Sequence, residues 1–155
     1  MPIREGAPAP DFKLAGSDGR SHTLADYAGR TLVIYFYPKD NTPGCTKEAC
    51  GFRDRFAALQ RSGVTLVGVS KDGLGSHDKF IADFQLPFIL LSDPTGAMMT
   101  AYGAFGEKIK DGKTVVGTIR STVIVGPDGN VTKHWATVKK AEDHPQEVLD
   151  YLAGS

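Results

Sequence analysis

The sequence has neither an excess of charge of one sign nor a long apolar run. Its 155 residues contain 18 basic and 18 acidic side chains, so the zero formal net charge gives no electrostatic reason to expect nucleic acid or an anionic membrane as a partner. No apolar run approaches the roughly 20 residues that cross a bilayer. The first ten residues, MPIREGAPAP, lack the basic and then apolar character of a signal peptide. We therefore expect a cytoplasmic protein with no membrane and no nucleic-acid partner.

Cysteine is scarce, and both cysteines lie close together at positions 45 and 50. In the reducing cytoplasm such a pair is more typical of reactive thiols than of a permanent structural disulfide. A zinc site would need further ligands, and the chain has four histidines. None of them is spaced like a member of a zinc ligand pair: His22, His77, His134 and His144. The sequence therefore predicts a reactive thiol pair without a bound metal.

Apolar strand-like runs alternate with amphipathic segments along the chain, which indicates the α/β class. The length predicts one domain over residues 1–155. A turn signal at GPDG, residues 126–129, joins the last two strands, so we expect a mostly parallel sheet with antiparallel edges. The predicted strands are 12–14 and 21–24 (a short hairpin), 31–37, 64–70, 88–91, 115–125 and 131–135. The predicted helices are 43–62, 75–85, 95–102 and 145–153.

Cys45 lies directly after a predicted buried strand, in the first turn of a predicted helix. Thr42 is a good N-cap residue, Pro43 suits the first helical position, and Cys45 takes the third. There a thiolate faces unpaired backbone N–H groups and the positive end of the helix dipole, which both favour the anion. As N-cap, Thr42 is expected to hold its hydroxyl beside the sulfur. Pro38 ends the strand and would shape the pocket.

A cation for this thiolate is predicted far along the chain. Arg120 interrupts the apolar run 118–125, and an interior arginine needs an anionic partner. The Cys45 thiolate can be that partner; alternatively, Arg120 lies on an edge strand and extends its stem to water. Glu48 lies three residues after Cys45, on the same helical face, and can either hold Arg120 in place or face solvent.

These residues resemble the active-site motif of the peroxiredoxins. The match comprises Pro38, Thr42 and Cys45 in the pattern PxxxTxxC, together with Arg120 in the downstream RST segment. The fuller string YPKDNTPGCTKEAC, residues 37–50, resembles the bacterioferritin-comigratory, or Q-type, peroxiredoxins. The similarity extends over nearly the whole chain. It implies a thioredoxin-like fold, in which helices flank a central mixed sheet with an N-terminal hairpin extension.

The resemblance also implies a chemistry. Cys45 would be the peroxidatic cysteine, which reduces hydrogen peroxide or organic hydroperoxides and becomes a sulfenic acid. Thr42, Arg120 and backbone N–H groups would bind the peroxide oxygens. Cys50 would be the resolving cysteine and would form an intramolecular disulfide that thioredoxin or a similar dithiol protein reduces. No metal, haem, flavin or other cofactor is implied, and an internal resolving cysteine leads us to expect a monomer.

The spacing of the two cysteines has a mechanical consequence. Five residues along an intact α-helix separate Cα atoms by about 9 Å, whereas a disulfide tolerates about 7 Å at most. We therefore expect residues 43–52 to unwind during turnover. A thiol–disulfide oxidoreductase is a rival interpretation, but such an enzyme would favour a CxxC pair. A thiol redox sensor is compatible with the same residues, and only repeated turnover with an electron donor distinguishes it from a peroxidase.

Overall fold

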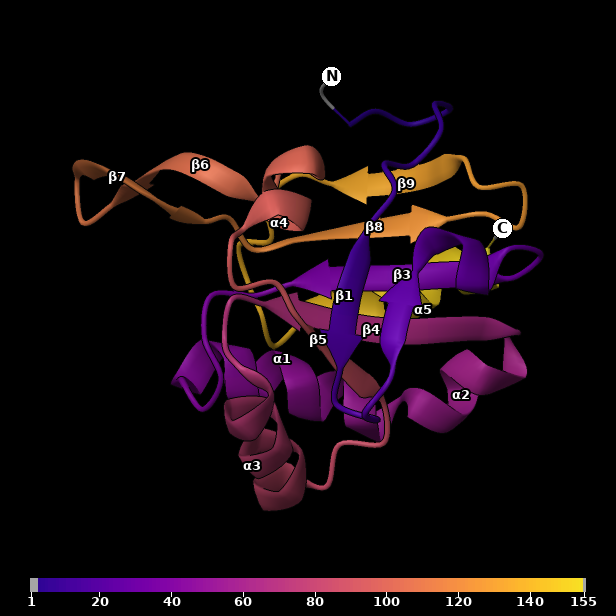
Figure 1. Cartoon of the computed structure of the whole chain (residues 1–155), viewed down its shortest axis with the longest axis horizontal. Coiled ribbons are helices and arrows are strands. Elements are labelled where there is room, and N and C mark those ends of the chain that lie inside the picture. Colours follow the sequence, from indigo (N-terminus) through magenta and orange to yellow (C-terminus); the bar gives the residue numbers. More distant parts are fainter. Residues whose placement is uncertain (1–2, 155) are drawn as a thin grey trace.

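A seven-stranded mixed sheet forms the centre of this computed structural model, which describes residues 3–154 (Figure 1). The strand order is β2-β1-β5-β4-β3-β8-β9. β3 pairs parallel with β4 and antiparallel with β8, so parallel and antiparallel pairing meet at β3. The strands are β1 (Lys13–Gly16), β2 (Ser21–Thr23), β3 (Thr31–Phe36), β4 (Val64–Ser70), β5 (Ile89–Ser92), β8 (Ser121–Val125) and β9 (Val131–Trp135).

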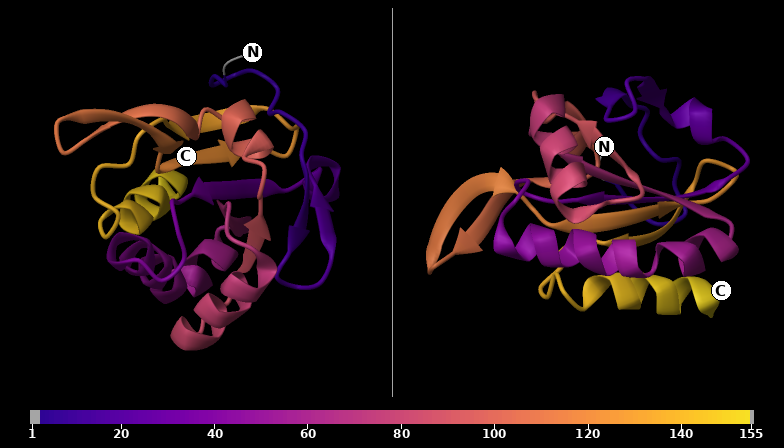
Figure 2. Two further views of the ribbon diagram at one scale, coloured as in Figure 1. Left: turned by 60° about the vertical axis from the view of Figure 1, so that its left-hand side comes forward. Right: turned by 90° about the horizontal axis from the view of Figure 1, so that it is seen from below.

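Two hydrophobic cores cover the two faces of this sheet. Alternation along β3 sends Leu32 and Ile34 into one core and Val33 and Tyr35 into the other. The first core also receives side chains from η1 (Leu24–Tyr27) and α4 (Ala97–Ala101). The second is covered by α1 (Pro43–Asp54), α2 (Phe56–Arg61), α3 (Leu74–Phe84) and α5 (His144–Ala153). Figure 2 shows α1 and α5 side by side, so α5 supports the helix that carries both cysteines. The expected α/β, thioredoxin-like architecture with its N-terminal β1–β2 hairpin is confirmed.

One predicted helix, 43–62, is interrupted in the structure. α1 ends at Asp54 and α2 begins at Phe56. The guanidinium of Arg55 donates a hydrogen bond to the carbonyl of Gly51, which the Arg55 backbone N–H would take in a regular α-helix. That N–H instead bonds the carbonyl of Phe52. The side chain of Arg55 therefore replaces a backbone bond and allows the chain to turn between the two helices.

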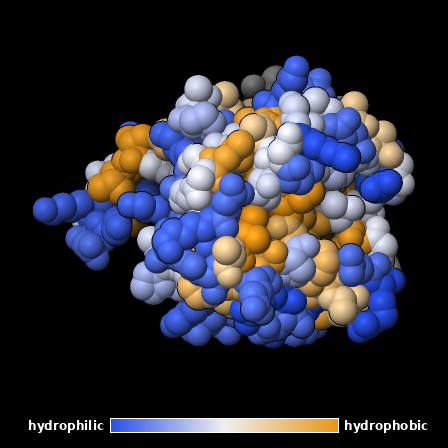
Figure 3. Space-filling view, turned by 60° about the horizontal axis from the view of Figure 1, so that its bottom comes forward, coloured by the Kyte–Doolittle hydropathy of each residue, from blue (hydrophilic) through white to orange (hydrophobic). Residues whose placement is uncertain are grey.

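The predicted strand 115–125 is also wrong as a single element. Its first half belongs to a separate two-stranded sheet, in which β6 (Phe105–Lys110) pairs with β7 (Lys113–Thr118). Asp111 and Gly112 both have positive φ at its tip, which a two-residue hairpin turn requires. This hairpin projects from the body (Figure 1), and Figure 3 shows apolar colour on it. Ile109 and Val116 on it are 72% and 67% exposed.

The structure contains no helix among residues 3–154 that is long and apolar enough to span a membrane. Residues 1, 2 and 155 of the predicted domain 1–155 lie outside the described residues. The extent of the domain therefore stays a prediction.

Candidate active site

The first turn of α1 holds Cys45 as the sequence predicts. Thr42 has extended backbone dihedrals and is the N-cap, Pro43 opens the helix, and the N–H of Thr46 donates to the Thr42 carbonyl at 2.8 Å. Cys45 is the third helical residue and only 1% exposed. Its thiol therefore lies in the first helical turn, whose backbone N–H groups have no partner within the helix.

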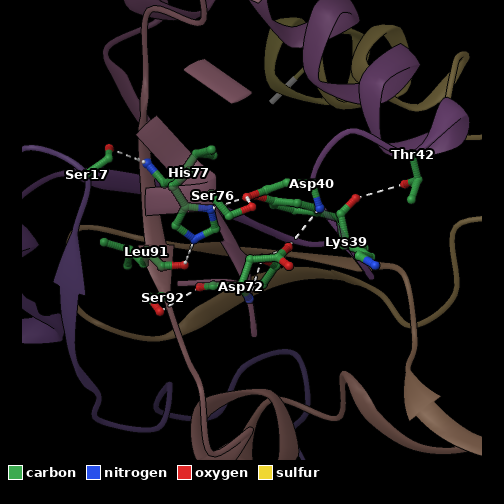
Figure 4. A network of polar contacts seen from close by, with 12 residues as sticks. Ser17, Lys39, Asp40, Thr42, Asp72, Ser76, His77, Leu91 and Ser92 are labelled. Atoms are coloured by element: carbon green, nitrogen blue, oxygen red, sulfur yellow. Dashed lines mark hydrogen bonds and ion pairs between the residues drawn. The ribbon is translucent and has the colours of Figure 1, made fainter. Parts of the chain in front are cut away.

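The hydroxyl of Thr42 does not cap this helix, contrary to the usual behaviour of an N-cap threonine. It donates instead to the carbonyl of Lys39 at 2.8 Å, which closes the turn before α1 (Figure 4). A hydroxyl has one proton to give and two lone pairs. With its proton directed at Lys39, the Thr42 oxygen is left as an acceptor, and the first N–H groups of the helix stay available to a ligand.

Arg120 contacts both acidic groups of the helix. Its Nη2 lies 3.4 Å from Sγ of Cys45, and its Nη1 donates to Oε1 of Glu48 at 2.7 Å. Burial alone would lower the pKa of Arg120, but the charges of Glu48 and Cys45 raise it. The structure thus brings together the arginine, the cysteine and the glutamate, and the solvent-facing alternatives for Arg120 and Glu48 are wrong.

Arg120 lies in the connection between β7 and β8, and its predicted place within a strand is wrong. Its carbonyl accepts the N–H of Val138, and the N–H of the preceding residue, Ile119, bonds the carbonyl of Ala104 in the register of the β6–β7 pairing. The guanidinium approaches α1 at Gly44, where a Cβ would lie 3.2 Å from Nη2. A residue without a side chain at position 44 therefore lets the cation reach the helix start.

Glu48 is fully buried in the second core. One carboxylate oxygen bonds Arg120, and the other, Oε2, has no hydrogen-bond partner among the described residues. Burial raises the pKa of Glu48 to about 7, although Arg120 acts in the opposite direction. The carboxyl beside Arg120 therefore holds its proton more tightly than an exposed glutamate does.

Cys50 lies one and a half turns after Cys45 in the same helix and is partly exposed. Both cysteines are free thiols. The intact helix keeps their Cα atoms about 9 Å apart, too far for a disulfide. The next residue, Gly51, faces Pro145 of α5 so closely that a Cβ would lie 2.7 Å from the proline ring. Gly51 is therefore a close-packing position between α1 and α5.

A surface cleft of about 400 Å³ reaches Arg120 from outside. It is lined by Gly44, Lys47, Arg120, Lys139, Lys140 and Glu142, among others. Pro38 is half-buried and lies two residues after β3 ends at Phe36, in the turn that leads to Thr42. No cluster of three or more possible metal ligands is found among residues 3–154.

A buried polar network around Asp40 lies beneath the turn that leads to Thr42. It was not predicted from the sequence, because its members come from three separate segments.

Comparison with known proteins finds relatives over nearly the whole chain. The chain matches the AhpC/TSA family over residues 6–134. A putative peroxiredoxin bcp of Coxiella burnetii is 41% identical over 152 residues, which cover 98% of this chain and 100% of the relative. Peroxiredoxin Bcp of Bacillus subtilis is also 41% identical, with 98% of this chain and 96% of the relative covered. A solved structure of Xanthomonas campestris peroxiredoxin Q has a TM-score of 0.88 at 40% identity, and the match covers 97% of each chain.

These relatives indicate one family. The site is consistent with it, because Cys45 lies in the first turn of α1 and Arg120 contacts its sulfur. The chain belongs to the AhpC/TSA family and is a peroxidase of its bacterioferritin-comigratory, or Q-type, peroxiredoxins.

Proposed function

We propose that this enzyme reduces hydrogen peroxide and organic hydroperoxides with Cys45 as its nucleophile. The thiolate sulfur attacks one peroxide oxygen, and the O–O bond breaks. Cys45 becomes a sulfenic acid while the second oxygen takes a proton and leaves as water or an alcohol. The contact of Arg120 with Cys45 at 3.4 Å is the observation that carries this assignment, because it places a permanent positive charge at the reacting sulfur. Alkyl peroxide reduction is ascribed to the bacterioferritin comigratory protein of Xanthomonas campestris, which is 39% identical.

The neighbouring groups are suited to hold the peroxide. The Thr42 hydroxyl donates its hydrogen bond to the Lys39 carbonyl, so we infer that its oxygen accepts a hydrogen bond from the peroxide O–H. Arg120 donates to the peroxide oxygens, on which negative charge develops as the O–O bond breaks. The N–H groups of the first α1 turn add further donors. Pro38 lies in the turn that leads to Thr42 and shapes its wall, and Glu48 fixes the direction of the guanidinium.

Cys50 would resolve the sulfenic acid. Its thiol attacks the sulfur of Cys45, a disulfide forms, and the hydroxyl leaves with a proton as water. Because both cysteines lie in α1, residues 43–52 must unwind before the sulfurs can meet. A dithiol protein such as thioredoxin then donates two electrons and two protons and restores both thiols. An internal disulfide of this kind fits a monomer that acts as a single domain over residues 1–155, and a cytoplasmic location would supply such a reductant.

Steady-state turnover tests this proposal. Peroxide consumption is followed with thioredoxin, thioredoxin reductase and NADPH for the wild type, C45S and C50S. We expect continuous turnover in the wild type, none in C45S, and in C50S a single oxidation without thioredoxin-linked cycling. Retained turnover in C45S would contradict the choice of nucleophile. A wild type that is oxidised once and never reduced by any dithiol donor would instead indicate a redox sensor.

A further inference from the structure

A buried polar network lies under the turn that carries Thr42. At its centre, the carboxylate of Asp40 accepts three hydrogen bonds. Its Oδ1 accepts one from the Tyr37 hydroxyl at 2.6 Å. Its Oδ2 accepts two, from Ser76 at 2.8 Å and from His77 Nδ1 at 2.7 Å (Figure 4). These bonds lower the pKa of Asp40 although its burial acts in the opposite direction. Asp40 is therefore an ionised acceptor, and each of its three partners must supply a proton.

His77 is a cation in this arrangement. Its ring lies between Asp40 and the backbone of β5, where Nε2 is 2.9 Å from the Leu91 carbonyl oxygen (Figure 4). A carboxylate and a carbonyl can only accept, so both ring nitrogens must donate, which requires the imidazolium form. His77 is fully buried, and its charge is paired with Asp40. Burial alone would lower the pKa of His77, but the hydrogen bond and charge of Asp40 raise it.

A second acid holds the backbone of the same turn. Asp72, from the connection between β4 and α3, accepts the backbone N–H of Asp40 at 2.7 Å and the Ser70 hydroxyl at 2.8 Å. The Ser92 hydroxyl bonds the Asp72 carbonyl. The groups that face His77 from the surrounding elements are thus Asp40 before α1, Asp72 after β4 and the uncharged Leu91 carbonyl on β5. Together they attach the turn to β4, β5 and α3.

The turn itself needs such an attachment. Asn41, between Asp40 and Thr42, has φ of +63°, a left-handed conformation that non-glycine residues rarely adopt. Thr42 follows at once, and its hydroxyl bonds back to Lys39. A shift of Asp40 would therefore move the Thr42 hydroxyl and the first turn of α1, which contains Cys45.

We propose that the buried Asp40–His77 ion pair is a positioning pair for the peroxidase site, which fixes residues 39–42 so that Thr42 and Cys45 keep their reactive geometry. Neither residue touches the sulfur; both act through the turn. This inference rests on the proposed role of Cys45 as the nucleophile. It assigns to α3, which contributes none of the residues of the cysteine motif, an influence on the rate of peroxide reduction that acts through residues 39–42.

Two substitutions of His77 separate its two hydrogen bonds. An asparagine amide nitrogen can take the place of Nδ1 and donate to Asp40, whereas a glutamine amide nitrogen can take the place of Nε2 and donate to Leu91. Both variants lose the charge and one bond. We measure the second-order rate of Cys45 oxidation by hydrogen peroxide, with sulfenic acid detected by mass spectrometry, in a C50S background where no Cys45–Cys50 disulfide can form. At pH 6, normalised to the folded fraction, H77Q should react about tenfold more slowly than the background protein and H77N about threefold more slowly.

The pH dependence supplies a second readout. The neutral form of His77 and the asparagine amide of H77N each offer a single N–H to Asp40, so the ratio of the C50S rate to the H77N rate should fall to one as pH rises through the raised pKa of His77. The ratio cancels the ionisation of Cys45 itself. S76A is the matched control, because it removes an uncharged donor from the same Asp40 oxygen, and it should lose about threefold or less.

Three results would overturn the proposal: equal losses in H77N and H77Q, an unchanged rate in H77Q, or a ratio that does not vary with pH. If H77Q does not fold, D40N replaces it; a loss of about tenfold is then expected, and an unchanged rate overturns the proposal. Failure of C50S itself to form sulfenic acid on Cys45 would contradict the proposed function instead, so the two failures are distinguishable.

Discussion

Arg120 joins Cys45 and Glu48 through the two nitrogens of one guanidinium, with Nη2 3.4 Å from Sγ and Nη1 2.7 Å from Oε1. The planar fork of arginine can hold two partners in fixed directions, which the point charge of lysine cannot. The glutamate therefore orients the cation that faces the sulfur. It also competes with the thiolate for that cation, to a degree that depends on its own ionisation.

R120K should slow peroxide reduction by about a hundredfold, because lysine keeps the charge but loses the two-partner geometry. The second-order rate of Cys45 oxidation by hydrogen peroxide is the relevant measurement. R61K is the control, since Arg61 is exposed at the end of α2, and it should react like the wild type. A rate for R120K within about threefold of wild type would mean that charge alone matters at this position.

Glu48 should make the stability of the reduced protein depend on pH. Its pKa is raised from 4.5 to about 7 on folding, so the folded state binds more protons between these values. The associated stability is fully present below pH 4.5 and is lost as pH rises through about 7, by up to about 3 kcal/mol. E48Q should not show this loss. Urea unfolding between pH 4.5 and 8 measures it, with E107Q on the exposed hairpin as control. Parallel curves for wild type and E48Q would contradict the prediction.

The same burial bears on the proposed unwinding of residues 43–52. Unwinding exposes Glu48 to water and removes the desolvation penalty on its ionised carboxylate. Because more of the carboxyl is ionised at high pH, α1 should open more readily at pH 8 than at pH 5. Amide exchange should show protected N–H groups over this segment in the dithiol form and rapid exchange in the disulfide form. Residues 74–84 of α3 should stay protected in both and act as the internal control. Equal protection of α1 in the two forms would disprove the unwinding.

G51A should destabilise the protein by about 1–3 kcal/mol, because the new Cβ would lie 2.7 Å from the ring of Pro145. G75A is a matched control: Gly75 also lies in a helix but has open space around it. Its replacement should stabilise by up to about 1 kcal/mol through helix propensity. Thermal unfolding of both variants decides between close packing and simple propensity, since propensity alone would stabilise both.

The sequence could predict the parts of this site that follow from local order. Thr42, Pro43 and Cys45 form a helix start by residue type and spacing alone, and the unbroken apolar run before them is a buried strand. Arg120 could be suspected because a charge within an apolar run needs a partner. The β6–β7 hairpin was not predicted because it has few apolar residues, although the Asp-Gly pair at 111–112 is a turn signal.

Other features depend on contacts between distant segments. The side chain of Arg55, at the break between α1 and α2, is held by Gln146 of α5, 91 positions along the chain. The complete burial of Glu48 depends on how α1 packs in the second core. The Asp40–His77 pair joins residues 37 positions apart, and the sequence around neither residue indicates that the two interact. Tertiary packing alone decides such contacts, so no propensity or periodicity could have predicted them.

The most direct test of the Cys45–Cys50 chemistry is the intact mass of the protein after one equivalent of hydrogen peroxide. The wild type should lose two hydrogens, because a disulfide joins Cys45 to Cys50 and no oxygen is retained. C50S should gain one oxygen, on Cys45, and C45S should remain unchanged. An oxygen gained by C45S, or a stable sulfenic acid in the wild type with Cys50 present, would contradict the roles assigned to the two cysteines.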